Sequence, residues 1–190
     1  MKIIGLTGGS GSGKSTASLV FAERGIRVFS ADGIYRRITS CDSECCREIG
    51  REFGDVLTES GALDRRRLFE VAFKGEGSAE RVLILNRITH KYVIAELERE
   101  LEELEKSGDT VAVFDAPLLI ECGYHEKCDV VLSVLADREV RIDRLMLRDS
   151  LDRESVCARL NAQKRDIFYI SASDYIIYNN GDTESFKSEF

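Results

Sequence analysis

The chain has 190 residues, of which 43% are hydrophobic and 32% charged, and its formal net charge at pH 7 is −7. This composition is ordinary for a globular protein and excludes a fibrous or disordered chain. The acidic balance argues against broad affinity for nucleic acid, because such binding needs basic surface to displace counterions.

The beginning of the chain bears on where the protein works. Residues 1–4 precede a glycine-rich stretch and are too few for a signal peptide, and no apolar run approaches the roughly 18 residues of a membrane span. We therefore expect a cytoplasmic protein that does not associate with membranes. This length predicts one compact α/β domain over residues 1–190, and no motif calls for an obligate protein partner.

A glycine-rich loop joins the first predicted strand, at residues 2–4, to a helix predicted from Lys14. Gly8 and Gly13-Lys14-Ser15 match the phosphate-loop pattern, in which glycines let backbone N–H groups converge on a polyphosphate. Lys14 is expected to reach the β and γ phosphates, and the Ser15 hydroxyl to bind Mg²⁺. A glycine-rich turn that binds nothing is the alternative, which the flanking strand and helix disfavour. The residues predicted to bind ATP here are Gly9, Ser10, Gly11, Ser12, Gly13, Lys14, Ser15 and Thr16.

A second strand is predicted at residues 26–30, after a helix that ends before Gly25. Asp32 follows this strand almost at once. Ligands of an open parallel sheet lie beyond the carboxyl ends of its strands, so Asp32 is expected at the same edge as the glycine loop, in a catalytic role. A helix N-cap is an alternative role for Asp32, and the two roles are compatible.

The next segment is helical. Helices are predicted at residues 42–53, 63–74 and 78–106, the last with a bend near Thr89 and His90. Because these residues are too many for a simple crossover between strands, they indicate an inserted subdomain that would hold a second substrate. The triplet Arg65-Arg66-Arg67 within it is either a solvated helix face or a phosphate-binding group.

Three further strands are predicted, at residues 110–114, 129–134 and 175–178. Asp115 directly follows the first of them, the usual position of a second magnesium contact downstream of a phosphate loop. Pro117, the only proline of the chain, indicates a shaped loop beside this site.

An arginine-rich segment lies before the last strand. Arg141, Arg144 and Arg148 share one face of a predicted helix and could converge on a ligand, although a solvated basic face is the alternative. Arginines that close over a phosphoryl group stabilise its developing charge and exclude water. The break at residues 149–152, with Asp152 as an N-cap, indicates the tip of a lid.

The six cysteines are expected to be free thiols. Cys122, His125 and Cys128 have the spacing of metal ligands, but a fourth ligand is not nearby, so packing beneath a loop is favoured over a zinc site.

Nearly end to end, the chain resembles the dephospho-coenzyme A kinases. The motifs that carry the resemblance are Gly5-Leu6-Thr7-Gly8-Gly9 through Thr16, Ala31-Asp32, Leu63-Asp64-Arg65-Arg66, Leu85-Asn86 with His90, Asp115 with Pro117-Leu118-Leu119 and Glu121, Arg144 with Arg148, Gln163, and Asp174 followed by Asn179-Asn180-Gly181. The Pro-Leu-Leu-x-Glu element together with this phosphate loop is much more specific than the loop alone. The chain departs from the family pattern at Ser30, where an aspartate is frequent, at Lys91, where proline is common, and in an early C-terminus.

The resemblance implies a fold and a reaction. The fold is a P-loop NTPase three-layer α/β/α domain with a five-stranded parallel sheet in the order 2-3-1-4-5. It has a nucleotide-binding core (residues 1–34, 107–136 and 166–190), a helical substrate-binding insertion (35–106) and an arginine-rich helical lid (137–165). The reaction converts ATP and 3′-dephospho-coenzyme A into ADP and coenzyme A.

The resemblance also implies roles for single residues. Asp32 would deprotonate the ribose 3′-hydroxyl, Lys14 would neutralise the phosphates with Mg²⁺ held by Ser15 and Asp115, and Arg144 and Arg148 would clamp the transferred group. Asn180 would border the adenine of ATP. The residues implied for the acceptor are Asp32, Arg66, His90, Pro117, Leu118 and Glu121.

Other classes of nucleotide-binding protein are separated by their motifs. A nucleoside or nucleoside-monophosphate kinase shares the fold and the lid, and only the element from Pro117 to Glu121 distinguishes it. A GTPase would need a guanine-binding motif and a glycine three residues after Asp115, and a transporter-type ATPase a Ser-Gly-Gly signature; the sequence has none of these. A nucleotide sensor without catalysis stays open by motif, but Asp32 and the lid arginines disfavour it.

Overall fold

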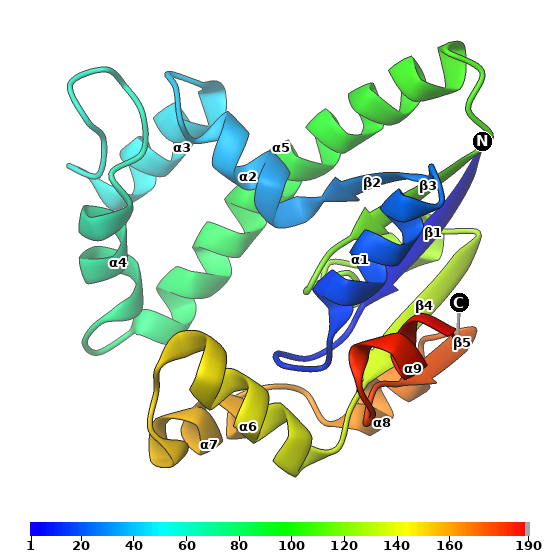
Figure 1. Ribbon diagram of the computed structural model, residues 1–190. Coiled ribbons are helices and arrows are strands. Elements are labelled where there is room, and N and C mark those ends of the chain that lie inside the picture. The colour runs from blue at the N-terminus through cyan, green and yellow to red at the C-terminus, as the bar shows by residue number, and fades with distance from the viewer. Residues whose placement is uncertain (189–190) are drawn as a thin grey trace. The chain divides into compact units, whose positions relative to one another are not determined.

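A computed structural model describes residues 1–188 of the protein (Figure 1). These residues form two compact units. The sheet unit combines Met1–Ser30 with the chain from Gly108 onward, and the helical unit is Ala31–Ser107.

The sheet unit is built on one parallel sheet of five strands in the order β2-β3-β1-β4-β5, which confirms the predicted order. All four neighbouring pairs are parallel. The strands are β1 Lys2–Thr7, β2 Arg27–Ser30, β3 Val111–Asp115, β4 Val130–Leu135 and β5 Tyr175–Tyr178. Strand β1 is longer than the strand predicted at residues 2–4. It continues in register beside β3 as far as the pair Leu6 and Asp115.

The sheet register gathers strand ends at one edge. Asp115 closes β3 opposite Leu6 of β1 and Ser30 of β2. Thr7, the last residue of β1, pairs with Ser133 of β4. The loop that follows Thr7 therefore begins at the edge where Asp115 stands, as expected for the carboxyl ends of parallel strands.

Side chains on the two faces of the sheet pack against different segments. On one face, Leu6 and Val113 join a buried cluster with Ala17 of α1 (Lys14–Glu23) and Phe186 of α9 (Thr183–Ser188). On the other face, Phe114 meets Tyr124 of the 3₁₀ turn η1 (Tyr124–Lys127), with ring centroids 5.1 Å apart. Because successive strand residues point to opposite faces, the sheet is covered on both sides and the unit has three layers.

The lid segment is a pair of helices, α6 Arg138–Asp149 and α7 Arg153–Asn161. The predicted break between them is confirmed by Ser150, whose φ of 53° is left-handed. The Asp152 carboxylate accepts a hydrogen bond from the N–H of Ser155 at 2.7 Å, which confirms the predicted N-cap. The pair is followed by α8 (Asp166–Ile170), which was not predicted, nor was α9.

The helical unit consists of α2 Ala31–Ile38, α3 Glu44–Phe53, α4 Arg65–Phe73 and α5 Ser78–Lys106. Each of α3 and α4 begins after a polar cap: the Ser43 hydroxyl accepts from the N–H of Cys46 at 3.1 Å, and the Asp64 carboxylate accepts from the N–H groups of Arg66 and Arg67 at 3.0 Å. Such caps stabilise a helix by about 1 kcal/mol each. Helix α5 continues through Thr89 and His90, where a bend was predicted, without interruption.

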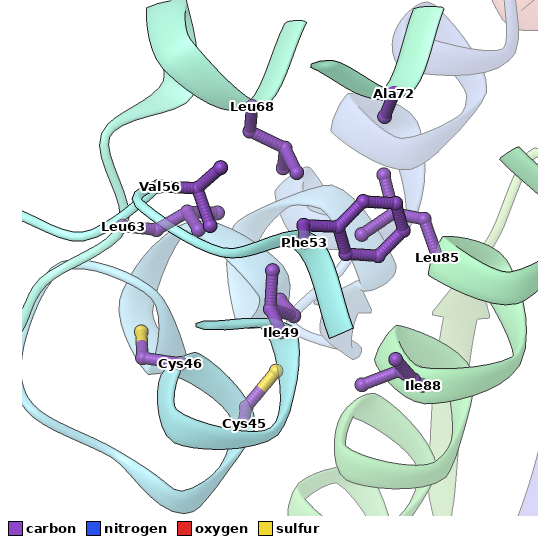
Figure 2. Close-up of a cluster of buried hydrophobic side chains, with 10 residues drawn as sticks. All are labelled: Cys45, Cys46, Ile49, Phe53, Val56, Leu63, Leu68, Ala72, Leu85 and Ile88. Atoms are coloured by element: carbon purple, nitrogen blue, oxygen red, sulfur yellow. The ribbon is translucent and has the colours of Figure 1, made fainter. Parts of the chain in front are cut away.

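This unit has its own hydrophobic core, drawn in Figure 2, where the Phe53 ring points toward Leu85 of α5. Ile49 at its centre is fully buried, and burying a side chain of that size contributes about 1.5–3 kcal/mol. The buried members are Cys45, Cys46, Ile49, Phe53, Val56, Leu63, Leu68, Ala72, Leu85 and Ile88. The helices of this unit therefore bury apolar side chains against one another.

All six cysteines are free thiols. Cys122 and Cys128, whose spacing is that of zinc ligands, donate weak hydrogen bonds to backbone carbonyl oxygens. The acceptor is Leu119 for Cys122, at 3.4 Å, and Tyr124 for Cys128, at 3.6 Å. Burial raises the pKa of the Cys128 thiol to about 12, which favours the protonated thiol. None of the described helices combines the length and apolar character required to cross a bilayer.

Candidate active site

The glycine loop between β1 and α1 depends on glycine at defined positions. Gly8, Gly11 and Gly13 have φ values of 146°, 78° and 101°, a region that favours glycine. A Cβ at Gly13 would lie 1.9 Å from the side-chain nitrogen of Asn179, and one at Gly8 would lie 2.3 Å from the carbonyl oxygen of Val134. Both the backbone conformation and the space around it therefore require glycine, as a phosphate-binding loop needs.

Lys14 and Asp115 form an ion pair at the edge of the sheet. The ammonium group of Lys14 donates to Oδ1 of Asp115, and the Ser18 hydroxyl donates to Oδ2 at 2.6 Å. Only 7% of Asp115 is exposed, and a buried carboxylate is tolerated when it is paired and hydrogen-bonded. Both side chains therefore lie next to the glycine loop, at the sheet edge where the sequence predicts them.

Ser18 joins this pair through its hydrogen bond to Asp115, a contact that the sequence did not predict. It lies one helical turn after Lys14 in α1, and its hydroxyl also reaches the Lys14 carbonyl oxygen at 3.2 Å. Its position four residues after the loop lysine is the only sequence signal, because serine at a helix turn is otherwise unremarkable.

The oxygen groups at this edge fit a magnesium ion that accompanies ATP. The exposed Ser15 hydroxyl and the Asp115 carboxylate are hard oxygen donors of the kind Mg²⁺ prefers. Residues 1–188 contain no cluster of three or more acidic, histidine or cysteine side chains that could hold an ion by themselves. The usual magnesium site in phosphoryl transfer has one or two protein ligands and completes its shell with water and phosphate oxygens.

The turn at residues 179–181 is tied to the glycine loop. The side-chain nitrogen of buried Asn179 donates to the carbonyl oxygen of Ser12 at 2.9 Å. Arg144 donates to the carbonyl and side-chain oxygens of Asn179 at 2.9 and 3.2 Å, and to the carbonyl oxygen of Gly181 at 3.2 Å. The side-chain oxygen of Asn180 accepts from the N–H of Asp137 at 2.7 Å. Asn179 is a second residue whose role the sequence argument missed.

The three arginines that share a face of α6 bind different groups in this structure. Arg141 is buried and reaches Ser10 of the glycine loop at 2.9 Å. Arg144 holds the 179–181 turn, and the exposed Arg148 pairs with both carboxylate oxygens of Asp149, at 2.7 and 2.9 Å. Within residues 1–188 no single group binds all three arginines, and their convergence on a ligand stays a prediction.

The loop after β3 is anchored to β1. The hydroxyl of Thr7 donates to the carbonyl oxygen of Pro117 at 3.4 Å. Pro117 and Leu118 are half-buried, and the side chain of Glu121 is exposed. The loop is therefore held beside the glycine loop, which also begins at Thr7.

Three further candidate residues lie in the helical unit. Asp32 is exposed in the first turn of α2, and no hydrogen bond or ion pair engages its carboxylate within residues 1–188. It is therefore not the N-cap that the alternative interpretation suggested, since the helix has already begun at Ala31. The exposed Arg66 follows the cap of α4. His90 is half-buried, and burial lowers its pKa, which favours the neutral imidazole at pH 7.

Comparison with known proteins extends these observations. A family model described as dephospho-CoA kinase matches residues 2–185. A dephospho-CoA kinase from Syntrophotalea carbinolica is 38% identical, over 100% of this chain and 89% of its own length. One from Corynebacterium glutamicum is also 38% identical, over 98% of this chain and 92% of its own length.

Three solved structures are similar to this chain in fold. A Thermus thermophilus protein is 32% identical with a TM-score of 0.80 and covers 98% of this chain and 92% of its own. A dephospho-CoA kinase from Campylobacter jejuni is 27% identical with a TM-score of 0.71, covering 100% and 94%. A shikimate kinase from Acinetobacter baumannii, at 17% identity and a TM-score of 0.54 over 100% and 90%, shares the fold.

The sheet order, the glycine loop and the lysine–aspartate pair at its mouth define a P-loop kinase. With the family model matching almost its whole length, the chain belongs to the dephospho-CoA kinase family.

Proposed function

We propose that the protein transfers the γ-phosphoryl group of ATP to the ribose 3′-hydroxyl of 3′-dephospho-coenzyme A. The products are ADP and coenzyme A. The observation that carries the proposal is the family match over residues 2–185, because it includes the helical unit as well as the glycine loop. The glycine loop accounts for the donor nucleotide, which many unrelated functions share, whereas the match to the remainder of the chain names the acceptor.

The glycine loop would hold ATP. Backbone N–H groups from Gly9 to Thr16 and the N-terminus of α1 favour the phosphates, and Lys14 would exchange its contact with Asp115 for the β and γ phosphate oxygens. Ser15 and Asp115 would hold Mg²⁺, which neutralises phosphate charge when bound. Asn180 would border the adenine ring.

Asp32 would act as the general base. Its carboxylate is exposed and has no partner within the described chain, so it is free to accept a hydrogen bond from a substrate hydroxyl. As the 3′-oxygen bonds to the γ-phosphorus and the bond to the ADP oxygen breaks, the hydroxyl proton would pass to this carboxylate. Arg144 and Arg148 would stabilise the charge on the transferred group, for which Arg148 must release Asp149.

Each unit contains residues that the family resemblance assigns to the acceptor. In the sheet unit, Pro117, Leu118 and Glu121 lie on the loop after Asp115, and in the helical unit, Arg66 and His90 supply a cation and a neutral imidazole.

A face of α4 suits the pantetheine arm of that acceptor. Arg66, Phe69 and Phe73 stand at positions i, i+3 and i+7, and the two phenylalanines are 50% and 47% exposed. Their rings stack with centroids 5.5 Å apart. A cation on the same helix face as exposed aromatic rings complements a molecule that joins phosphate groups to an arm of methylene, methyl and amide groups.

Replacement of Phe73 by serine tests this face. We expect KM for dephospho-coenzyme A to rise about tenfold, about 1.4 kcal/mol, which is part of the free energy of burying an aromatic side chain. The methyl ester of ADP, which has the same ribose and diphosphate but no arm, should be phosphorylated with unchanged kinetics. Val71→Ser, on another side of α4, is the matched control. Equal effects on both acceptors, or no effect on either, would refute the assignment.

A panel of acceptors tests the proposed function. With ATP as donor, ADP release is measured for dephospho-coenzyme A and for a set of nucleosides and nucleoside monophosphates at equal concentration. We expect turnover with dephospho-coenzyme A to exceed all others by at least about 10², because a site built for several substrate groups loses binding energy when they are missing. Faster turnover of a nucleoside monophosphate would favour the alternative, a nucleoside-monophosphate kinase.

A further inference from the structure

The base of the lid is hydrogen-bonded to the glycine loop at Ser10. Two side chains make this contact: Arg141 from α6 and Gln163, which lies just after α7. In sequence they lie 131 and 153 residues from Ser10. The two ends of the α6–α7 pair are thus fixed to one residue of the loop that would bind ATP.

Ser10 is held through its backbone and its side chain. Arg141 donates from Nε to the Ser10 carbonyl oxygen at 2.9 Å. The side-chain oxygen of Gln163 accepts from the Ser10 N–H at 3.1 Å, and its side-chain nitrogen donates to the Ser10 hydroxyl at 2.5 Å. Backbone N–H, carbonyl and hydroxyl of one loop residue are therefore all engaged.

Arg141 and Gln163 also bind each other. Nη2 of Arg141 donates to the Gln163 side-chain oxygen at 2.8 Å, and Nη1 lies 3.6 Å from the carboxylate of Asp166. Only 8% of Arg141 is exposed. Burying a guanidinium group costs free energy unless its N–H groups make hydrogen bonds. The network therefore has little freedom to rearrange.

The loop is shaped to receive this network. A Cβ at Gly9 would lie 2.6 Å from Nη2 of Arg141, and one at Gly11 would lie 3.0 Å from the Arg141 carbonyl oxygen and 3.1 Å from Leu145. Two glycines of the loop thus make room for residues of α6. The contact is a close fit between the lid helix and the loop.

We infer that Arg141 and Gln163 are positioning residues, which fix the phosphate-binding conformation of the loop at Ser10 and tie the loop to the α6–α7 pair. They would not touch the reacting atoms. Their contribution would be to preorganise the loop N–H groups, because misplacement of a binding group by about 1 Å costs as much as 10² in rate. The inference depends on the proposed function in one respect, that the nucleotide bound by the loop is ATP.

Nucleotide binding tests the inference without an acceptor, so an error in the proposed acceptor would leave the test intact. The dissociation constant of MgATP is measured by isothermal titration calorimetry, well below the melting temperature of each variant. Gln163→Met keeps the length of the side chain and removes its side-chain hydrogen bonds. It should weaken MgATP binding by about 10- to 100-fold, the range typical of residues that orient the ligands of a metal site. Arg141→Met should do the same.

The conservative variant separates positioning from packing. In Gln163→Glu, the carboxylate can accept from the Ser10 N–H, the Ser10 hydroxyl and Arg141, so binding should stay within about fivefold of wild type. Arg138→Met is the matched control, since Arg138 donates to the side-chain oxygen of Asn161 of α7 at 2.8 Å and makes no hydrogen bond to the glycine loop within residues 1–188. Its MgATP affinity should not change.

Two results would overturn the inference. One is wild-type MgATP affinity in Gln163→Met, whatever its melting temperature. The other is an equal loss in Arg138→Met and Gln163→Met, which would trace the effect to helix pairing. If Arg141→Met fails to fold, the two Gln163 variants and the control still decide the question.

Discussion

Replacement of Asp32 by asparagine should lower kcat by about 10² to 10⁴, which corresponds to about 3–5 kcal/mol of activation free energy. Asparagine has nearly the same shape but cannot accept the proton of the 3′-hydroxyl. Since Asp32 is exposed and makes no hydrogen bond or ion pair within residues 1–188, the change should leave the fold intact. The measurement is steady-state ADP release with saturating ATP and dephospho-coenzyme A.

ATP affinity is the control for this variant. It should stay within about twofold of wild type, because the glycine loop supplies the nucleotide contacts and the base acts on the acceptor. Asp32→Glu would test geometry, since it keeps the base but moves it. Full activity in Asp32→Asn would remove Asp32 from the mechanism.

Replacement of Lys14 by methionine should reduce kcat by about 10² to 10³, the usual cost of removing one preorganised charge partner of the transition state. It should also destabilise the protein by about 3–5 kcal/mol, because Asp115 then stays buried without its cation. Thermal unfolding followed by circular dichroism measures the second effect separately from the first.

The double variant Lys14→Met with Asp115→Asn distinguishes these two consequences. Removing the unpaired carboxylate should restore most of the lost melting temperature, since a neutral amide costs less to bury and still accepts from Ser18. Catalysis should not recover, because the double variant lacks both the lysine proposed to bind the phosphates and the carboxylate proposed to hold Mg²⁺. Recovery of activity together with stability would show that Lys14 serves the fold and not the phosphates.

The fold followed from hydrophobic patterns wherever an element was long or buried on both faces. Strand β3 and helix α5 are examples, because a continuous apolar run and a repeated apolar stripe each have few alternatives. Helices α8 and α9 escaped prediction because five or six residues give too little periodicity to read. The strand order came from the family resemblance, since no pattern in a single sequence fixes which strands are neighbours.

The candidate site divides in the same way. Local motifs predict the glycine loop, Lys14 and Asp115 as parts of the site, because the chemistry of a phosphate loop requires particular residues at fixed spacing. The roles of Ser18, Asn179 and the Arg141–Gln163 pair depend on side chains that meet only after folding. Arg141 shows the difference most clearly. The sequence groups it with Arg144 and Arg148 on one helix face, whereas in the structure its side chain donates a hydrogen bond to Ser10.

Regiochemistry tests the central claim most directly. ADP release is measured with dephospho-coenzyme A and with coenzyme A as the acceptor, and the position of the new phosphate is determined by phosphorus NMR. Our account predicts turnover with dephospho-coenzyme A, phosphate on the ribose 3′-oxygen, and no turnover with coenzyme A, whose 3′-position is already occupied. Phosphorylation of coenzyme A, or a phosphate at another position of dephospho-coenzyme A, would contradict it.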